Sequence, residues 1–490
     1  MKQYPSGYSW PTPTAEHLGV APHPMGSQRA FPGADRYLFV LGLALTGYAV
    51  MGRGFAYIGL PPLFIGEMLL AIGGLLWITG RSVRQSLSLV PMSLLMVMIV
   101  WVTIRMVPYI GAYGVDAPRD AMIAGYGLFA FIVAGFVLER PDRLHTLLRR
   151  YKTFVLIVIS LGWSVYLLYR QMPDVFPKWP WAEIRMVENK PGDLLVHLAG
   201  ATAFLVLGFR RSTPWVITLL LVGVAVGVIG TRGGMIAYVL SLAVFAVMKP
   251  PPAKFGRLIY AIVLFAVLGL IVDTSSLKTS EGSRALSTEQ IVDNVLSIFG
   301  RSDSFELNTT AEWRMEWWTK ITDYTVFGQY FWTGKGFGVN LAKDDGFSVS
   351  DDQALRSPHN GHLTMLARGG VPGLLLWLAV HISWLVYVLG AWLDARRMRR
   401  YTWMGVFAFI MVYWTAGMIN AAFDVYLEGP MGAIWFWTFF GLGMACARLY
   451  RERPTFWDDH DKEDAVPIQP LRTHAWSWGA NPEVSTTVGA

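Results

Sequence analysis

A cluster of polar side chains lies in the stretch Arg356–Gly373, which leads into a long apolar run. Its sequence Ser357-Pro-His-Asn360 predicts the start of a helix, because a residue before proline avoids the helical region and proline is tolerated in the first turn. A neutral imidazole there can accept a proton from a hydroxyl near neutral pH. His359 is therefore a candidate general base, and a histidine that merely caps the helix is the alternative. His362 and Arg368 fit a structural role as well as a substrate contact.

A second candidate is Arg232, which stands among glycines in the segment Gly230-Thr-Arg-Gly-Gly234, where two apolar runs meet. Glycine lets a partner approach the backbone closely. A guanidinium can bind a diphosphate through two parallel hydrogen bonds. The alternative is an arginine that extends from a helix end toward the membrane surface. Glycine on both sides is poor helix sequence, which favours a ligand.

Three further sites carry ionisable groups near the ends of apolar runs, where such groups are costly and are treated as functional hypotheses. Asp193 and His197 are four residues apart and so share one helix face, either as a hydrogen-bonded structural pair or as part of a ligand pocket. Arg119 is a candidate substrate ligand unless Asp120 simply neutralises it. Glu67 is expected to have a buried partner such as an arginine.

The amino-acid composition indicates that membrane-spanning helices would position these residues. The chain has 490 residues, of which 15% are charged, and its mean hydropathy is +0.40. A soluble protein would carry about 25% charged residues. The net charge of +7 is spread between apolar runs and does not indicate nucleic-acid binding. The predicted fold is an all-α polytopic membrane protein with about 12 transmembrane helices, at residues 37–52, 63–79, 87–107, 121–138, 153–169, 194–209, 214–230, 234–248, 258–272, 371–393, 403–421 and 430–447.

The distribution of lysine and arginine predicts the orientation. With a cytoplasmic N-terminus, the short inside loops carry sixteen positive residues and the short outside segments carry eight. The first apolar run then acts as an uncleaved anchor. The predicted parts are a cytoplasmic tail (1–36), transmembrane helices 1–9 (37–272), a large periplasmic loop with short helices (273–370), transmembrane helices 10–12 (371–447) and a disordered cytoplasmic tail (448–490).

The predicted loop contains three features of its own. Thr309-Thr-Ala-Glu312 indicates a capping box at the start of a helix. That helix carries Trp313, Trp317 and Trp318 on one side, so it either lies at the membrane surface or packs on its neighbours as an ordinary amphipathic helix. The glycine-rich segment 334–338 lacks the ending of a phosphate-binding loop and is predicted to be a turn. Acidic pairs in the loop are interpreted as solvated loop residues, and no metal site is predicted.

The chain resembles the O-antigen ligase and O-antigen polymerase superfamily of bacterial membrane proteins over roughly residues 60–445. His359-Asn360, followed after nine residues by Gly370-x-x-Gly373, is similar to the ligase family's histidine motif. The layout, with one large outer loop before the last helices, is similar as well. Further similar positions are Thr231-Arg-Gly-Gly234, Glu312-Trp-Arg-Met-Glu-Trp317 and Gly334-x-Gly-x-Gly338.

The resemblance implies a GT-C-like glycosyltransferase of the bacterial inner membrane. Such an enzyme moves a glycan from undecaprenyl diphosphate to an acceptor hydroxyl at the periplasmic face, with inversion and without a metal or other cofactor. The acceptor would be lipid A-core for a ligase or another lipid-linked repeat unit for a polymerase, of lipopolysaccharide or exopolysaccharide, with a chain-length regulator as a possible partner. His359 would activate the acceptor, and Arg232 would bind the diphosphate with help from Arg314 or Arg301. The remaining candidate substrate ligands are Arg119, Asn360, Asp193 and His197.

A transporter or flippase for a polysaccharide precursor is the alternative, because twelve helices are common in transporters. Transporters tend to place charges at the membrane midplane and to contain repeated halves. This sequence shows no repeat between its halves, and its notable charges lie at the predicted outer surface. The transferase is therefore the favoured interpretation.

Overall fold

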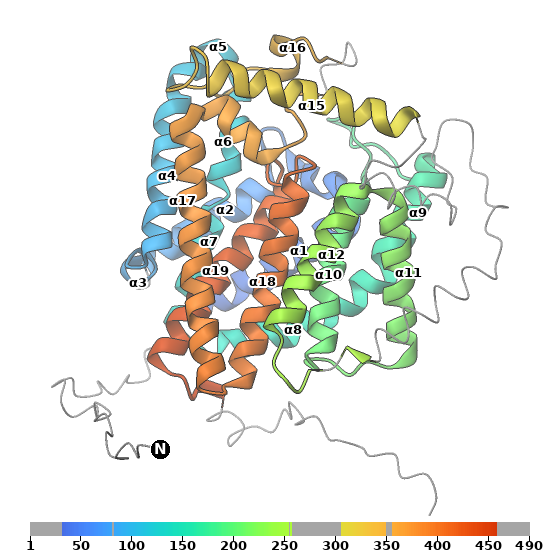
Figure 1. Ribbon diagram of the computed structural model, residues 1–490, viewed down its shortest axis with the longest axis vertical. Coiled ribbons are helices and arrows are strands. Elements are labelled where there is room, and N and C mark those ends of the chain that lie inside the picture. The colour runs from blue at the N-terminus through green and yellow to red at the C-terminus, as the bar shows by residue number, and fades with distance from the viewer. Residues whose placement is uncertain (1–31, 81–82, 254, 257–304, 349–354, 458–490) are drawn as a thin grey trace, which may run out of the picture.

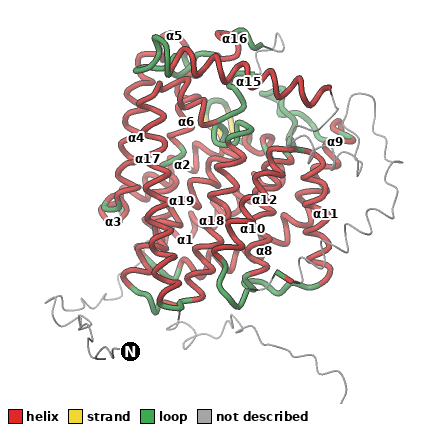
Figure 2. Tube along the Cα trace, viewed as in Figure 1, coloured by secondary structure: helices red, strands yellow, loops and turns green. Residues whose placement is uncertain are grey.

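A computed structural model describes residues 32–80, 83–253, 255–256, 305–348 and 355–457. These residues are mostly helical, and the strands among them form one short antiparallel hairpin (Figure 2), β1 (Gly59–Leu60) with β2 (Leu63–Phe64). The described α-helices are α1 (Pro32–Met51), α2 (Ile65–Thr79), α3 (Val83–Leu87), α4 (Val90–Met106), α5 (Ile110–Tyr113), α6 (Asp116–Gly125), α7 (Leu128–Glu139), α8 (Arg143–Ile157), α9 (Trp163–Gln171), α10 (Pro191–Val206), α11 (Pro214–Gly230), α12 (Arg232–Met248), α15 (Phe305–Thr325), α16 (Leu341–Asp345), α17 (Gly361–Arg397), α18 (Tyr401–Ala421) and α19 (Pro430–Glu452).

Seven helical segments in the described part are long and apolar enough to cross a membrane, and four shorter apolar helices accompany them. Each of these segments overlaps one predicted apolar run. The predicted run 258–272 lies outside the described residues, so the count of twelve stays a prediction. At the C-terminal end, α19 continues to Glu452, and Phe456 and Trp457 are buried. The start of the predicted disordered tail is therefore ordered.

The long helices run side by side and form a bundle (Figure 1). Helices α7, α10, α18 and α19 bury most of their residues and form its centre. Outer helices carry exposed apolar side chains, such as Val97 and Ile104 on α4 and Ile382 and Val386 on α17. A contiguous apolar outer surface of this kind is what lipid tails require of a membrane protein.

Helix α15 lies across one end of the bundle (Figure 1). Trp317 is fully buried and stacks on Phe347 at 5.1 Å between ring centroids. Its indole N–H donates to Asp345 at 2.7 Å, and the indole of Trp318 donates to the carbonyl of Pro358 at 2.9 Å. The sequence left open whether this helix lies at the membrane surface or packs on its neighbours. Trp317 and Trp318 follow the second arrangement, since both bond to neighbouring segments.

The predicted capping box at Thr309 is wrong. Helix α15 begins at Phe305, so Thr309 lies inside the helix. Threonine is favoured at helix starts, but this preference is a local signal. Here the residues before Thr309 are helical too, so Thr309 does not cap the helix. This correction moves the start of the helix by about one turn and leaves Arg314 on the same helix.

The glycine-rich segment 334–338 forms a turn, as predicted. Gly334, Gly336 and Gly338 have φ of 58°, 90° and 99°, the left-handed region that favours glycine. A Cβ on Gly334 would lie 2.3 Å from the carbonyl carbon of Arg368. The turn therefore packs its backbone directly on α17.

Gly334→Ala is expected to destabilise the protein more than Gly346→Ala. Both glycines have positive φ, but a Cβ on Gly346 meets nothing within 4 Å. Gly346→Ala, the control, is expected to lower the free energy of unfolding by about 1 kcal/mol through backbone strain alone. Gly334→Ala is expected to lower it by about 2–4 kcal/mol, because the backbone of α17 also blocks the added methyl group. Thermal unfolding of the purified variants in one detergent measures the difference. Equal losses would show that the close packing of the turn contributes no stability.

Helix α17 is interrupted at Gly370, whose φ is 66°. The break leaves backbone groups without helical hydrogen-bond partners, and the loop around residues 331–335 supplies partners for them. Val371 N–H donates to the carbonyl of Phe331 at 2.8 Å, and Lys335 N–H donates to the carbonyl of Ala367 at 2.7 Å. It separates a short first helix, 361–369, from a long apolar segment, 371–397. The predicted boundary between loop and membrane helix falls at the same glycine.

Candidate active site

His359 lies two residues before the first residue of α17, at the end of the bundle covered by α15. Its φ of 52° is unusual for a residue with a side chain and costs about 1–2 kcal/mol. Neighbouring bonds hold this conformation. Trp318 binds the carbonyl of Pro358, and the Asn360 side chain caps α17 by accepting from the backbone N–H groups of His362 and Leu363, both at 3.1 Å. Strain of this kind concentrates at functional sites.

Asn360 is thus the N-cap of α17. From the sequence it was predicted only to be a substrate ligand. The alternative considered for His359, that it caps the helix itself, is wrong, because the capping side chain belongs to the next residue. A substrate contact from Asn360 stays a prediction.

The His359 ring contacts a carboxylate from a distant part of the chain. Its Nδ1 lies 3.3 Å from Oδ1 of Asp424, in the loop between α18 and α19. Lys190, the residue before α10, donates to both Asp424 oxygens at 2.9 Å. A carboxylate at Nδ1 favours a proton on that nitrogen and leaves Nε2 free to accept another. The His359 side chain is 29% exposed, so a substrate can reach it.

The ion pair keeps Asp424 charged. Burial by itself would raise the pKa of Asp424, but the attraction of Lys190, with hydrogen bonds from His359, Lys190 and the Val425 N–H, holds that pKa well below its usual range. For Lys190, burial favours the neutral form, yet Asp424 and then Asp193 outweigh it and raise the pKa above its usual value. Both groups are therefore ionised at neutral pH, and His359 faces a permanent negative charge.

Asp424 was missed by the reasoning from sequence. It lies in Phe423-Asp-Val-Tyr-Leu-Glu428, a short segment between two apolar runs. An acid in such a segment is a signal that could have drawn attention to it. Its pairing with His359, 65 residues away in the chain, could not be derived from spacing.

Arg314, and the helix that begins at Arg232, meet the same loop. Arg314 on α15 donates from Nη1 to the carbonyl of Phe423 at 3.1 Å. Gly233 on α12 packs against Phe423, where an added Cβ would lie 2.6 Å from the Phe423 Cβ. The neighbouring Arg232 is the first residue of α12, partly buried, and Thr231 caps the helix by accepting from Gly234 N–H at 3.4 Å. The structure therefore brings Arg314 and the start of α12 to the residue before Asp424.

Several cations lie at this loop beside the acids Asp424 and Asp193. They are Lys190 and Arg314, and the start of α12 adds the partial positive charge of a helix N-terminus. Within the described residues Asp424 is the acid that pairs with both Lys190 and His359. The surroundings suit a ligand that carries more than one negative charge, as a diphosphate does.

His197 is buried in the bundle, whereas Asp193, in the first turn of α10, lies close enough to Lys190 to raise the pKa of that lysine. Asp193 accepts from the side chain of Asn420, a buried residue of α18, at 3.1 Å. His197 is 1% exposed and its ring lies 4.8 Å from that of Trp435. The contacts described for the two residues do not join them to each other, so the hydrogen-bonded structural pair is not what forms. Their roles as substrate ligands stay predictions.

Arg119 belongs to a separate ion cluster. It binds Asp116 at 3.0 Å and Asp120 at 3.5 Å, and 52% of its side chain is exposed. Asp120 also accepts from Arg368 at 2.9 Å and from Arg356 at 3.2 Å. The cluster ties α6 to α17, which gives Arg368 a structural role. A substrate contact from the exposed side of Arg119 stays a prediction.

Two further predicted residues make bonds inside the bundle. His362 accepts from the Trp377 indole at Nδ1, 3.1 Å away, and its Nε2 lies 3.0 Å from the carbonyl of Met418. Its ring is thereby fixed as a structural element. Glu67 has a buried partner, as predicted: the hydroxyl of Tyr126 donates to it at 2.7 Å, in place of the arginine given as an example. Arg301 lies outside the described residues.

The comparison with known protein families bears on this geometry. Residues 216–378 match the family model described as O-antigen ligase. The matched segment includes Arg232, Arg301, Arg314 and His359, but not Lys190 or Asp424. A search of curated proteins gives no match. Residues 216–378 are therefore similar to the O-antigen ligase family, and the match supports a membrane glycosyltransferase-like function in polysaccharide assembly.

Proposed function

We propose that the protein transfers a glycan from undecaprenyl diphosphate to an acceptor hydroxyl at the periplasmic face of the bacterial inner membrane. The observation that carries the proposal is the array Lys190–Asp424–His359, whose loop also contacts Arg314 on α15 and the start of α12. In this array a carboxylate contacts the histidine at Nδ1, which leaves Nε2 free to accept a proton.

The array supplies the proton transfer that such a reaction needs. The acceptor hydroxyl loses its proton to Nε2 of His359 while its oxygen attacks the anomeric carbon of the donor sugar. The bond from that carbon to the diphosphate oxygen breaks, and the diphosphate leaves with the electron pair. A direct displacement of this kind inverts the configuration at the anomeric carbon. Asp424 stabilises the imidazolium that forms, as a carboxylate does in other histidine bases.

The positive residues act on the leaving group. Charge builds up on the diphosphate as the glycosidic bond breaks, and fixed cations that face it lower the barrier. Arg232 and Arg314 can each offer paired N–H groups to a phosphate. Their charges serve the purpose that a divalent cation serves in other transferases, so the proposed mechanism uses no metal ion.

Arg232→Ala is expected to weaken donor binding by about 10–100-fold, the loss of one or two charge-assisted hydrogen bonds. Titration of the purified protein with a lipid-linked oligosaccharide diphosphate measures the dissociation constant. Arg185→Ala is the matched control, because Arg185 bonds within its own loop, to Asp174 at 2.7 Å and to Pro173. Unchanged binding by the Arg232 variant would place the diphosphate elsewhere.

Both a ligase and a polymerase need this donor site, and they differ in the acceptor. We favour a ligase, with lipid A-core as the acceptor, because the matching family model is that of O-antigen ligase. Glycan analysis of a deletion strain distinguishes the two. Full-length chains left on the carrier lipid indicate a ligase, whereas single repeat units on the carrier indicate a polymerase, whose chain length a separate regulator would set.

A further inference from the structure

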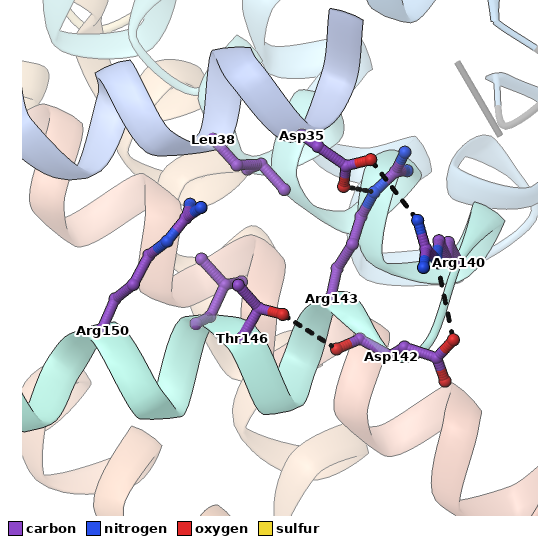
Figure 3. A pocket seen from close by; sticks show the side chains of 8 residues that line it. Asp35, Leu38, Arg140, Asp142, Arg143, Thr146 and Arg150 are labelled. Atoms are coloured by element: carbon purple, nitrogen blue, oxygen red, sulfur yellow. Dashed lines mark hydrogen bonds and ion pairs between the residues drawn. The ribbon is translucent and has the colours of Figure 1, made fainter. Parts of the chain in front are cut away.

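A cavity of about 200 Å³ lies between α1 and α8, away from the candidate active site. Asp35, in the first turn of α1, borders it, while Val50 near the other end of α1 accepts from Asn189, the neighbour of Lys190. Fifteen residues of helix separate Asp35 from Val50, which corresponds to about 22 Å. The lining residues, shown in Figure 3, are Asp35, Leu38, Arg140, Asp142, Arg143, Thr146, Leu147 and Arg150.

The three arginines that line the cavity differ in how closely carboxylates of the protein pair with them. Arg143 is 3% exposed and binds Asp35 at 2.7 Å and Glu139 at 3.0 Å. Arg140 makes longer contacts, at 3.5 Å to Asp35 and 3.6 Å to Asp142. Arg150 extends from α8 toward α1 (Figure 3), and no carboxylate partner is described for it. Arg140 and Arg150 therefore leave hydrogen-bond donors available to an added anion.

The exposed surface next to the cavity is apolar. Asp35, Phe39 and Leu43 follow one another at intervals of four residues, so they lie along one face of α1. Phe39 is 48% exposed and Leu43 is 56% exposed. The guanidinium of Arg150 lies 4.9 Å from the centre of the Phe39 ring, at the junction of the two surfaces. The charged cavity and the apolar surface lie side by side. A phosphate that carries acyl chains can contact both, whereas a free phosphate can contact only the cavity.

We propose that this cavity binds the phosphate of an anionic membrane phospholipid, with an acyl chain along Phe39 and Leu43. Guanidinium groups bind phosphate oxygens in pairs, and Arg140 and Arg150 approach the cavity from two sides. The loop before α8 belongs to the end that the charge distribution predicts to be cytoplasmic, where basic pockets between helices bind lipid head groups. The bound lipid would join α1 to α8 at that end of the bundle.

Native mass spectrometry of the full chain, purified in a neutral detergent and titrated with phosphatidylglycerol, tests the proposal. Arg150→Gln is expected to weaken phosphatidylglycerol binding by about tenfold, as the loss of one charge-assisted contact predicts. Arg149→Gln is the matched control, since it removes the same charge from the next residue, which is exposed and does not line the cavity. Its affinity is expected to stay at the wild-type value.

Two comparisons identify the ligand. Phosphatidylcholine, whose head group is neutral overall, is expected to bind the wild-type chain at least tenfold more weakly, and inorganic phosphate is expected not to compete at millimolar concentration. Equal weakening by the two arginine variants would overturn the site, because it would show a general charge effect. Displacement of the lipid by inorganic phosphate would overturn the lipid assignment and leave a free-anion site.

Discussion

His359→Ala is expected to lower the rate of glycan transfer by about 10²–10⁴-fold, the usual contribution of a general base. The substitution removes the nitrogen that accepts the hydroxyl proton and leaves Arg232, Arg314 and Lys190 in place. Donor binding is therefore expected to remain within about twofold of the wild-type value. Single-turnover transfer with a defined lipid-linked donor measures the rate, and a binding titration of the same preparation measures donor affinity.

The alanine variant also separates the chemical role of His359 from a structural one. Its side chain contacts Asp424, whereas Asn360 caps the helix, so α17 is expected to form normally. His145→Ala is the control, because His145 lies beside Trp457 at 4.4 Å between ring centroids and away from α15. Full transfer by His359→Ala would contradict the assignment as a base. A loss of donor binding as large as the loss of rate would make His359 a donor ligand instead.

Asp424→Asn is expected to lower kcat by about 10²–10³-fold with little change in the KM for the donor. The amide has nearly the same shape as the carboxylate, but its NH₂ group donates to Nδ1 of His359 and so favours the proton on Nε2. A ring in that tautomer cannot accept the hydroxyl proton at Nε2, and a misplaced tautomer of this kind lowers kcat strongly in a histidine triad. Steady-state kinetics over a range of donor concentrations separates kcat from KM.

A second variant shows whether Asp424 acts on the histidine or only on stability. Asp424→Asn leaves Lys190 without its carboxylate, which is expected to cost about 1–3 kcal/mol because both groups are partly exposed. The double variant Asp424→Asn with Lys190→Met removes the unpaired charge and is expected to recover thermal stability but not kcat. Recovery of kcat together with stability would mean that Asp424 merely supports the fold.

The positions of the helices could be read from the sequence because hydropathy and length are local properties. An apolar run of sufficient length forms a helix in lipid, where every backbone group needs an internal partner. The same holds for Gly370, whose freedom at positive φ marks the break in α17, and for His359, which Pro358 places at a helix mouth. The glycine neighbours of Arg232 are a similar local signal, and its role as a diphosphate ligand stays a prediction.

Errors arose where a local signal competed with packing. Thr309 resembles a helix cap, yet α15 starts earlier, at Phe305. Glu67 has the buried partner that was expected, but this partner is the hydroxyl of Tyr126 and not an arginine. Residue type predicts that a buried acid has a partner, whereas the identity of that partner depends on which helix faces it.

Local features of the chain were enough to predict a helical membrane protein with a histidine at a helix mouth and an arginine among glycines. Only the packing of the folded chain shows that Asp424 and Lys190, 234 residues apart, pair with each other and that Asp424 contacts His359. It also decided that Arg119 and Arg368 bind acids of α6 in a separate cluster. Such pairings follow from how the helices rotate and pack against one another, and contacts between distant segments are not encoded in local spacing or periodicity.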